Sequence, residues 1–237
     1  MVFFAARVHA SEVMDQPGLD PSRHRDALRG LSRVNRISGT AGNLWSRIRT
    51  ARPIAPETRL RVLDLACGGG DVLLDLAERS AGHLVPIEFF GRDLSETAIT
   101  HAREAAQRRG LLNVEFSQAD ALRDAFSDGP FDIVFCTLFL HHLNRDDATS
   151  LLRRMAAMSS QIVLIDDLRR SGLGYLFAWV GCRILSRSPI VHVDGPSSAR
   201  AAFTEPEVLR MAEDAGLHRA TMTRHWPQRF LFEWRHA

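Results

Sequence analysis

The feature that most constrains the fold is a regular alternation of short apolar runs and helical segments between residues 60 and 166. The apolar runs are predicted as buried strands at 61–66, 85–91, 114–118, 131–137 and 161–166. The segments between them are predicted as helices with one apolar face at 71–81, 96–109 and 146–158. Because apolar strands that alternate with helices indicate a parallel sheet covered on both faces, the pattern predicts a doubly wound α/β fold.

Beyond the fifth strand the pattern changes. We expect an apolar helix at 173–185, then a loop that carries proline and glycine, then a helix at 205–215 with Thr204 as its N-cap. The final runs 220–226 and 229–234 are β-like and close together, so they predict an antiparallel hairpin. The sheet is therefore predicted to have seven strands, mostly parallel, with an antiparallel end.

The N-terminal region is predicted to be helical. Residues 1–21 read as a loosely docked start, and residues 22–49 repeat apolar positions at helical spacing, which predicts two short helices. A connector is expected at Pro53 and Pro56. We therefore predict a helical extension at 1–56 and a main domain at 57–237.

The composition excludes several functions. All thirty basic residues are arginine, and the absence of lysine rules out phosphate-loop nucleotidases, Schiff-base chemistry and the Tyr-Lys pair of short-chain dehydrogenases. The net charge of +2 predicts no strong attraction to nucleic acids or anionic membranes. The ten histidines form no motif such as H-E-x-x-H, so no metal site is predicted.

Cysteine usage and apolar segments bear on location. The chain has three widely spaced cysteines, Cys67, Cys136 and Cys182, which favours a reducing compartment over a disulfide scaffold. The apolar runs at 2–6 and 172–182 are too short for a signal peptide core and a membrane span, respectively. We expect a cytoplasmic protein without stable membrane insertion, and its oligomeric state stays open.

A glycine bend follows the first predicted strand. Cys67 is followed by Gly68, Gly69 and Gly70, and a helix begins directly afterwards. Glycines let the backbone turn tightly and approach a ligand closely, and the helix start offers free N–H groups. Ligands in doubly wound sheets bind at this carboxyl edge.

Acidic residues follow the next two strands. Asp93 can accept hydrogen bonds from two ribose hydroxyls, and Asp120 from an adenine amino group. The nicotinamide fingerprint G-x-G-x-x-G requires a third glycine, but Leu73 stands there. This departure favours S-adenosylmethionine over NAD, although a nicotinamide oxidoreductase stays as an alternative.

Four segments resemble the motifs of class I S-adenosylmethionine-dependent methyltransferases. They are VLDLACGGGDV (62–72), GRDLSETAI (91–99), QADAL (118–122) and FDIVFCTLFLHHL (131–143). The resemblance implies a Rossmann-like fold that binds S-adenosylmethionine and releases S-adenosylhomocysteine. The cofactor contacts that it implies, or that the strand ends suggest, are Asp64, Ala66, Cys67, Gly68, Gly70, Asp93, Leu94, Asp120, Ala121 and Thr137. The sequence departs from the pattern at Ala66, where many members carry glycine.

A looser similarity connects the chain to quinone-biosynthesis and phenolic methyltransferases. Residues 33–48 are similar to their N-terminal helical lid, and residues 197–217 to the segment in which an arginine, here Arg200, faces the substrate. Trp45 is a further candidate for the pocket wall. The tetrapeptide typical of nucleic acid amino-methyltransferases is replaced by Cys-Thr-Leu-Phe at 136–139, which favours a small-molecule acceptor and no nucleic acid partner.

The expected reaction is methyl transfer to a phenolic or quinol-like oxygen. A phenol of pKa near 10 benefits from a base, and His141 and His142 follow the fourth strand beside the expected methyl position. We prefer His142 over His141. C-methylation of an activated aromatic or quinone precursor is one alternative, and a non-catalytic methyltransferase-like module that binds partners is another.

Overall fold

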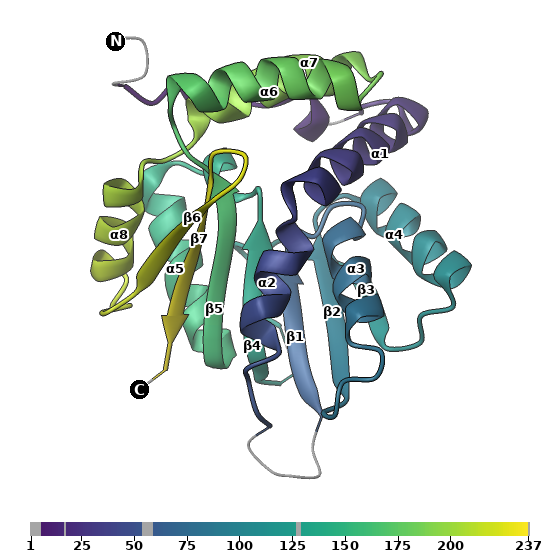
Figure 1. Ribbon diagram of the computed structural model, residues 1–237, viewed down its shortest axis with the longest axis vertical. Coiled ribbons are helices and arrows are strands. Elements are labelled where there is room, and N and C mark those ends of the chain that lie inside the picture. The colour runs from purple at the N-terminus through teal and green to yellow at the C-terminus, as the bar shows by residue number, and fades with distance from the viewer. Residues whose placement is uncertain (1–5, 17, 54–58, 127–128, 237) are drawn as a thin grey trace.

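The computed structural model describes residues 6–16, 18–53, 59–126 and 129–236 of the 237-residue chain. The strands of the described part form one sheet in the order β3-β2-β1-β4-β5-β7-β6 (Figure 1). Their bounds are Leu60–Leu65 (β1), Ile87–Asp93 (β2), Val114–Gln118 (β3), Phe131–Thr137 (β4), Ser159–Leu168 (β5), Thr221–His225 (β6) and Arg229–Arg235 (β7).

The pairing confirms the predicted seven-stranded sheet with an antiparallel end. Strands β1 to β5 pair parallel with one another, and the order reverses at β1, which lies between β2 and β4. Strand β7 pairs antiparallel with both β5 and β6. Ligands bind beyond the carboxyl ends of such sheets at this reversal point, which is where the predicted glycine bend lies.

Helices cover both faces of the sheet. The bounds are Pro21–Ser38 (α1), Thr40–Ile48 (α2), Asp71–Arg79 (α3), Glu96–Arg109 (α4), Arg145–Met158 (α5), Gly172–Leu185 (α6), Pro189–Ala201 (α7) and Glu205–Asp214 (α8). Helices α2, α3 and α4 share one apolar core with the sheet, and α5 and α8 share another (Figure 1). Since strand side chains alternate between faces, Val62 joins the first core and Leu63 the second.

Local signals place several helix ends where the sequence predicted them. Ser95 accepts a hydrogen bond from the Ala98 N–H at the start of α4, and Gly110 ends that helix in the left-handed conformation at φ 65°. Thr204 forms a capping box with Glu207 at the start of α8. These contacts satisfy backbone groups that a helix end otherwise leaves unpaired.

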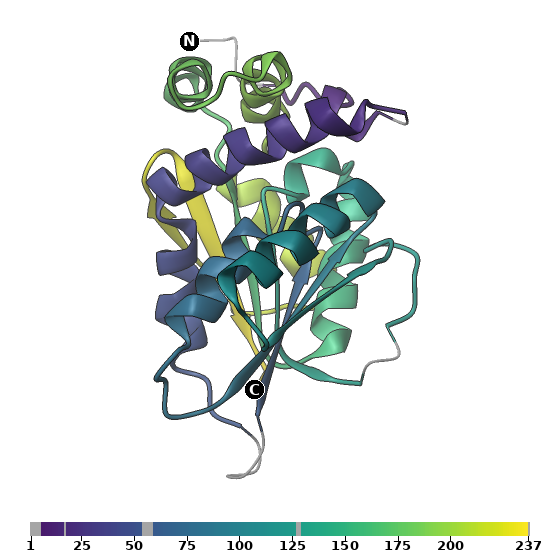
Figure 2. The ribbon, with the colours of Figure 1, turned by 90° about the vertical axis from the view of Figure 1, so that its right-hand side faces the viewer.

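A cap lies across the carboxyl edge of the sheet. It consists of α1, α6, α7 and the short 3₁₀ helix η1 (Val13–Asp15), as both views of the ribbon show (Figures 1 and 2). The expected loop after α6 was wrong, because residues 189–201 form helix α7. Pro189 is tolerated in the first turn, and Gly195 lets α7 approach α6 so closely that an added Cβ would lie 2.2 Å from the Cys182 Sγ.

The start of the chain is docked more firmly than predicted. The Arg7 guanidinium donates hydrogen bonds of 2.7 Å to the carbonyls of His141 and Leu143. Leu44 and Ile48 of α2 are fully buried against the sheet, so this part of the N-terminal region packs into the main core. The predicted boundary between residues 56 and 57, and Pro56 itself, lie outside the described residues.

Two further expectations concern the cysteines and membrane-spanning helices. Cys67, Cys136 and Cys182 are buried free thiols, as expected for a chain without a disulfide scaffold. Among the helices that the structure describes, none combines the length and apolar character needed to cross a membrane.

An ion pair between buried Arg170 and half-buried Glu207 makes the stability of α8 pH-dependent. Arg170 donates to both carboxylate oxygens of Glu207 at 2.8 and 3.0 Å, and the Thr204 N–H donates at 2.7 Å. Burial alone would raise the pKa of Glu207, but these hydrogen bonds outweigh it and lower the pKa to about 2.

We expect Glu207→Gln to lower the free energy of unfolding by about 1.5–3 kcal/mol at pH 7, because hydrogen bonds to a charged acceptor are lost. A lowered carboxyl pKa stabilises the fold above the ordinary value near 4.5, and this contribution disappears as the pH falls through about 2. Urea unfolding should therefore show a smaller difference from wild type at pH 3 than at pH 7. Glu104→Gln, which removes only an exposed ion pair with Arg108, is the control.

Candidate active site

A cavity of about 980 Å³ separates the cap from the carboxyl edge of the sheet. On the sheet side it is lined by the loop after β1, the end of β2 and the loops after β3 and β4. On the cap side it is lined by residues of η1, α1, α6 and α7. The lining includes eight residues predicted to bind the cofactor: Ala66, Cys67, Gly68, Asp93, Leu94, Asp120, Ala121 and Thr137.

The loop after β1 is held in a strained, tight bend. Ala66, Gly68 and Gly70 all have positive φ, at 57°, 53° and 74°. At Gly70 an added Cβ would also lie 2.7 Å from the Phe116 ring and 2.9 Å from the Ala102 Cβ. Ala66 stands where the related motif often carries glycine. Its left-handed backbone conformation is one that glycine adopts at a lower free-energy cost.

Asp93 lies where β2 ends and binds this bend. Its two carboxylate oxygens accept hydrogen bonds from the N–H groups of Gly68, at 2.7 Å, and Ser95, at 2.8 Å. Burial raises the pKa of Asp93, and the two backbone hydrogen bonds partly offset that effect. Each carboxylate oxygen keeps a second lone pair, so Asp93 can still accept from hydroxyl groups of a ligand in the cavity.

Asp64 is an orphaned acid at the end of β1. It is 1% exposed, and neither carboxylate oxygen has a hydrogen-bond partner within the described part of the chain. Burial, followed by the charges of Asp71 and Asp93, raises its pKa well above the ordinary range. Buried polar atoms are almost always paired in folded proteins, so this carboxyl fits a site that a polar ligand completes.

The loop after β3 is arranged by its own acids. Asp120 accepts a hydrogen bond from the Leu122 N–H at 2.8 Å, and the Asp120 N–H donates to Asp124 at 2.8 Å. These contacts fix Asp120 and Ala121 at the cavity wall, across from Leu94. A flat, polar-edged ring can be held between such backbone and carboxylate groups.

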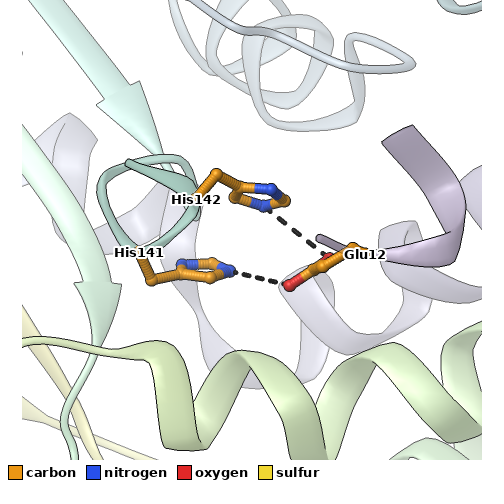
Figure 3. A group of neighbouring side chains, drawn as sticks. All are labelled: Glu12, His141 and His142. Carbon is orange, nitrogen blue, oxygen red and sulfur yellow. Dashed lines mark ion pairs between the residues drawn. The ribbon is translucent and has the colours of Figure 1, made fainter. Parts of the chain in front are cut away.

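A second group of polar side chains lies beyond the end of β4, the neighbour of β1, and we call it the histidine–carboxylate cluster, defined as Glu12, Asp15, His141, His142 and Asp167. His141 and His142 belong to a 3₁₀ turn, η2 (Leu140–His142), after β4. The Nδ1 of His141 lies 2.7 Å from Asp167, and the Nδ1 of His142 lies 2.7 Å from Asp15. Both Nε2 atoms face the Glu12 carboxylate, at 3.4 and 3.7 Å (Figure 3).

The cluster is strongly coupled electrostatically. Burial alone would lower the pKa of His141, but Asp167 and Glu12 outweigh it and raise the pKa to about 10. Burial would raise the carboxyl pKa of Asp167 and of Glu12, yet their contacts with the histidines hold both below the ordinary range. In the absence of another cation, His141 is therefore protonated at neutral pH.

The cap side of the cavity is largely apolar. Phe177, Val180 and Leu185 of α6 face it together with Leu31 and Val34 of α1. The apolar helix predicted at 173–185 thus contributes to the wall of the cavity. Arg169 and Arg229 add positive charge near the end of β5.

Two predicted substrate contacts do not reach this cavity. Arg200 lies on α7 with an exposed side chain and is not among the described lining residues. Trp45 lies on α2, where its ring packs edge-on against His83 with centroids 5.4 Å apart. The sequence placed Trp45 on a helix and Arg200 in a loop, and in neither case could it show whether the side chain faces the cavity.

Three members of the cluster were missed in the sequence. Asp167 directly follows Asp166, the last residue of a predicted strand, and this acidic pair at a carboxyl edge was a usable signal. Glu12 and Asp15 lie in a stretch without periodicity or motif, so no local signal marks them. They reach the site because Asp194 of α7 accepts hydrogen bonds from the N–H groups of Val13 and Met14.

Comparisons with known proteins agree with this geometry. Residues 62–161 match the family model described as a methyltransferase domain. The chain is 34% identical over 134 residues to the demethylmenaquinone methyltransferase of Thermus thermophilus, which covers 56% of this chain and 59% of that protein. It thus spans about three fifths of that relative. It is also 34% identical over 182 residues to the ubiquinone biosynthesis O-methyltransferase of Thiobacillus denitrificans, covering 75% of this chain and 72% of that protein.

The fold recurs in solved structures. A SAM-dependent methyltransferase from Aquifex aeolicus superposes with a TM-score of 0.64 at 18% identity, covering 92% of this chain and 98% of that one. At this identity the likeness concerns the fold alone.

The bend after β1 can be tested by a matched pair of substitutions. Gly70 and Gly82 both have positive φ, 74° and 80°, but only Gly70 has neighbours that an added Cβ would meet. We expect Gly82→Ala to cost about 1–2 kcal/mol from backbone strain, and Gly70→Ala about 1–3 kcal/mol more from overpacking against Phe116. Equal losses of unfolding free energy in urea would contradict the close packing at Gly70.

Proposed function

This chain belongs to the S-adenosylmethionine-dependent methyltransferases, and we propose that it transfers the cofactor's methyl group to the oxygen of a small phenolic or quinol-like acceptor. One observation carries the proposal: a single cavity joins the glycine bend and Asp93 to the histidine–carboxylate cluster. The cofactor and acceptor sides of a transfer reaction would then share one enclosed space, from which the cap excludes water.

The residues at the sheet edge suit the cofactor. We propose that Asp93 holds the ribose hydroxyls, that Asp120 and Ala121 flank the adenine, and that the bend at 66–70 lies against the methionine part. Asp64 does not line the cavity, but its unpaired carboxyl lies near the end of β1, directly before this bend. The cofactor supplies a methyl group already activated by a sulfonium, so the protein's task is alignment and deprotonation.

The cap side suits a flat, apolar acceptor. Phe177, Val180 and Leu185 offer apolar surface, and the histidine–carboxylate cluster offers polar groups at one end of it. The relatives are named for menaquinone and ubiquinone biosynthesis, which supports an aromatic or quinone-like acceptor for this chain. The lining does not include Arg200 or Trp45, so we propose that the cap helices α1 and α6 contact the acceptor in their place.

We propose His142 as the group that takes the acceptor's proton. Its side chain is 20% exposed, whereas that of His141 is 3% exposed and enclosed between Asp167 and Glu12. His142 is thus the histidine that an acceptor hydroxyl can approach. Deprotonation creates a phenolate, whose oxygen attacks the methyl carbon as the carbon–sulfur bond breaks. C-methylation through the same phenolate is the second candidate, and it differs in the atom that carries the methyl group.

The cofactor assignment rests on Asp93. Titration calorimetry should show one molecule of S-adenosylhomocysteine bound per chain, and Asp93→Ala should weaken binding about 100-fold or more, since two hydrogen bonds to a charged acceptor are lost. The exposed Asp146→Ala is the matched control and should bind as wild type does. Unchanged affinity in Asp93→Ala, or binding of NAD in place of the adenosyl ligand, would remove the assignment.

The base assignment rests on His142. With labelled S-adenosylmethionine and a panel of phenols and quinols, we expect His142→Ala to lower turnover about 10²–10⁴-fold at pH 7. The loss should shrink toward pH 10, where a phenol ionises unaided. S-adenosylhomocysteine binding should persist, and His218→Ala, an exposed histidine paired with Glu213, serves as control. Wild-type turnover in His142→Ala would contradict the assignment, and product spectra distinguish O-methyl from C-methyl.

A further inference from the structure

The arrangement of nitrogen and oxygen atoms in the histidine–carboxylate cluster has a use beyond proton transfer. Glu12, His141 and His142 each direct one ligand-type atom to a common point, and these three atoms lie within 4.8 Å of one another (Figure 3). We propose that these three residues bind a divalent transition metal ion, such as Zn²⁺, at the wall of the active-site cavity.

Both imidazoles are oriented as metal ligands are. Each Nδ1 is 2.7 Å from a carboxylate, Asp167 for His141 and Asp15 for His142, so each Nε2 is left facing Glu12. A histidine that binds a metal almost always donates its other N–H to a carboxylate, carbonyl or water, which fixes its tautomer and orientation. Here that arrangement occurs twice around one point.

Contacts with α7 also hold Glu12 in place. The Ser198 hydroxyl donates to its Oε1, and Asp194 fixes the following turn through the N–H groups of Val13 and Met14. The side chain is buried, yet its two oxygens are turned toward the two histidines, not toward solvent. A carboxylate positioned in this way completes a set of two nitrogens and one oxygen.

The separations suit a small ion. Ligand atoms about 2.0–2.1 Å from a tetrahedral Zn²⁺ lie about 3.4 Å from one another. The distance between His141 Nε2 and Glu12 Oε1 is 3.4 Å, and that between His142 Nε2 and Glu12 Oε2 is 3.7 Å. All three ligand atoms lie within 4.8 Å of one another, and His142, whose side chain is 20% exposed, is the least enclosed of the three ligands. All three residues line the cavity, so a fourth position stays open toward a ligand there.

The charges also favour a cation. Three carboxylates, Glu12, Asp15 and Asp167, face two imidazoles. Asp194 lies nearby, and Arg7 contributes its guanidinium to backbone carbonyls of the η2 turn. A divalent ion balances this excess of negative charge, and it allows both histidines to bind as neutral ligands.

A metal at this point has a chemical consequence that rests on the proposed function. An acceptor hydroxyl bound at the open position loses its proton to water more readily, because the ion stabilises the phenolate. The phenolate oxygen then bonds to the methyl carbon while the carbon–sulfur bond of the sulfonium breaks, which leaves S-adenosylhomocysteine. In the metal-loaded protein His142 is a ligand and the proton leaves to solvent, so the metal ion replaces the base role proposed above for His142.

The proposal departs from the prediction, made from the sequence, that the chain has no metal site. A motif search detects ligands at short, regular spacing, such as H-E-x-x-H. Here only His141 and His142 are neighbours, and the third ligand comes from the N-terminal segment that the cap holds in place.

The test is metal binding by the full chain after treatment with EDTA. We expect calorimetry and elemental analysis to give one Zn²⁺ per chain, and Co²⁺ to give a visible absorption band typical of nitrogen and oxygen ligation. Glu12→Gln and His142→Ala should weaken Zn²⁺ binding at least 100-fold, and Asp15→Asn about 10- to 100-fold through His142. His218→Ala, which alters an exposed His–Glu pair, should bind Zn²⁺ as wild type does.

Binding of S-adenosylhomocysteine by each variant shows that it has folded. No stoichiometric Zn²⁺, or equal binding by wild type and Glu12→Gln, would overturn the metal site. If either result is found and methyl transfer continues in EDTA, the metal site is overturned and the proposed function stands. Conversely, Zn²⁺ binding that needs Glu12, without methylation of any acceptor tested, supports the metal site and counts against the proposed function.

Discussion

A buried ion pair within the sheet, between β5 and β7, supports the contact of the cap with the sheet. The Arg229 Nη2 lies 2.6 Å from Asp166, and both side chains are at most 2% exposed. Arg229 also donates to Asn35 of α1, which in turn donates to Asp71 at the start of α3. Loss of one member would leave a buried charge uncompensated, at a cost of about 3–5 kcal/mol. The position of α1 over the glycine bend therefore depends on this pair.

The carboxyl end of β5 organises both halves of the site. Asp166 and Asp167 are consecutive in a strand, so their side chains point to opposite faces. Asp166 binds Arg229 and His225, which belong to the antiparallel end of the sheet. Asp167 binds His141 and so orients the histidine–carboxylate cluster. The alternation of side chains along β5 thus positions two features. One is the Asp166–Arg229 pair, which contacts α1 through Asn35, and the other is the histidine–carboxylate cluster at the cavity wall.

The sequence predicted what is locally encoded. Apolar periodicity identified every strand of the sheet, and Thr204 marked the start of a helix because a cap is a contact within one turn. Helix α7 was missed because Gly195 and Pro196 carry turn signals, while the packing of α7 against α6, which favours the helix, is tertiary. Glu12 was missed for the same reason, since no contact near it in sequence defines its place.

The cofactor contacts that the sequence predicted and the residues that it missed lie on different sides of the cavity. The side proposed for the cofactor is built from strand ends and the bends directly after them, so its residues appear as short motifs whose geometry the sheet dictates. The side proposed for the acceptor is built from side chains of η1, α1 and α6, which meet only because the cap has folded over the edge. Substitutions in the cap can therefore change which acceptor fits while the sheet and the cofactor contacts stay the same. For this reason a sequence of this kind reveals its methyl donor far more readily than its acceptor.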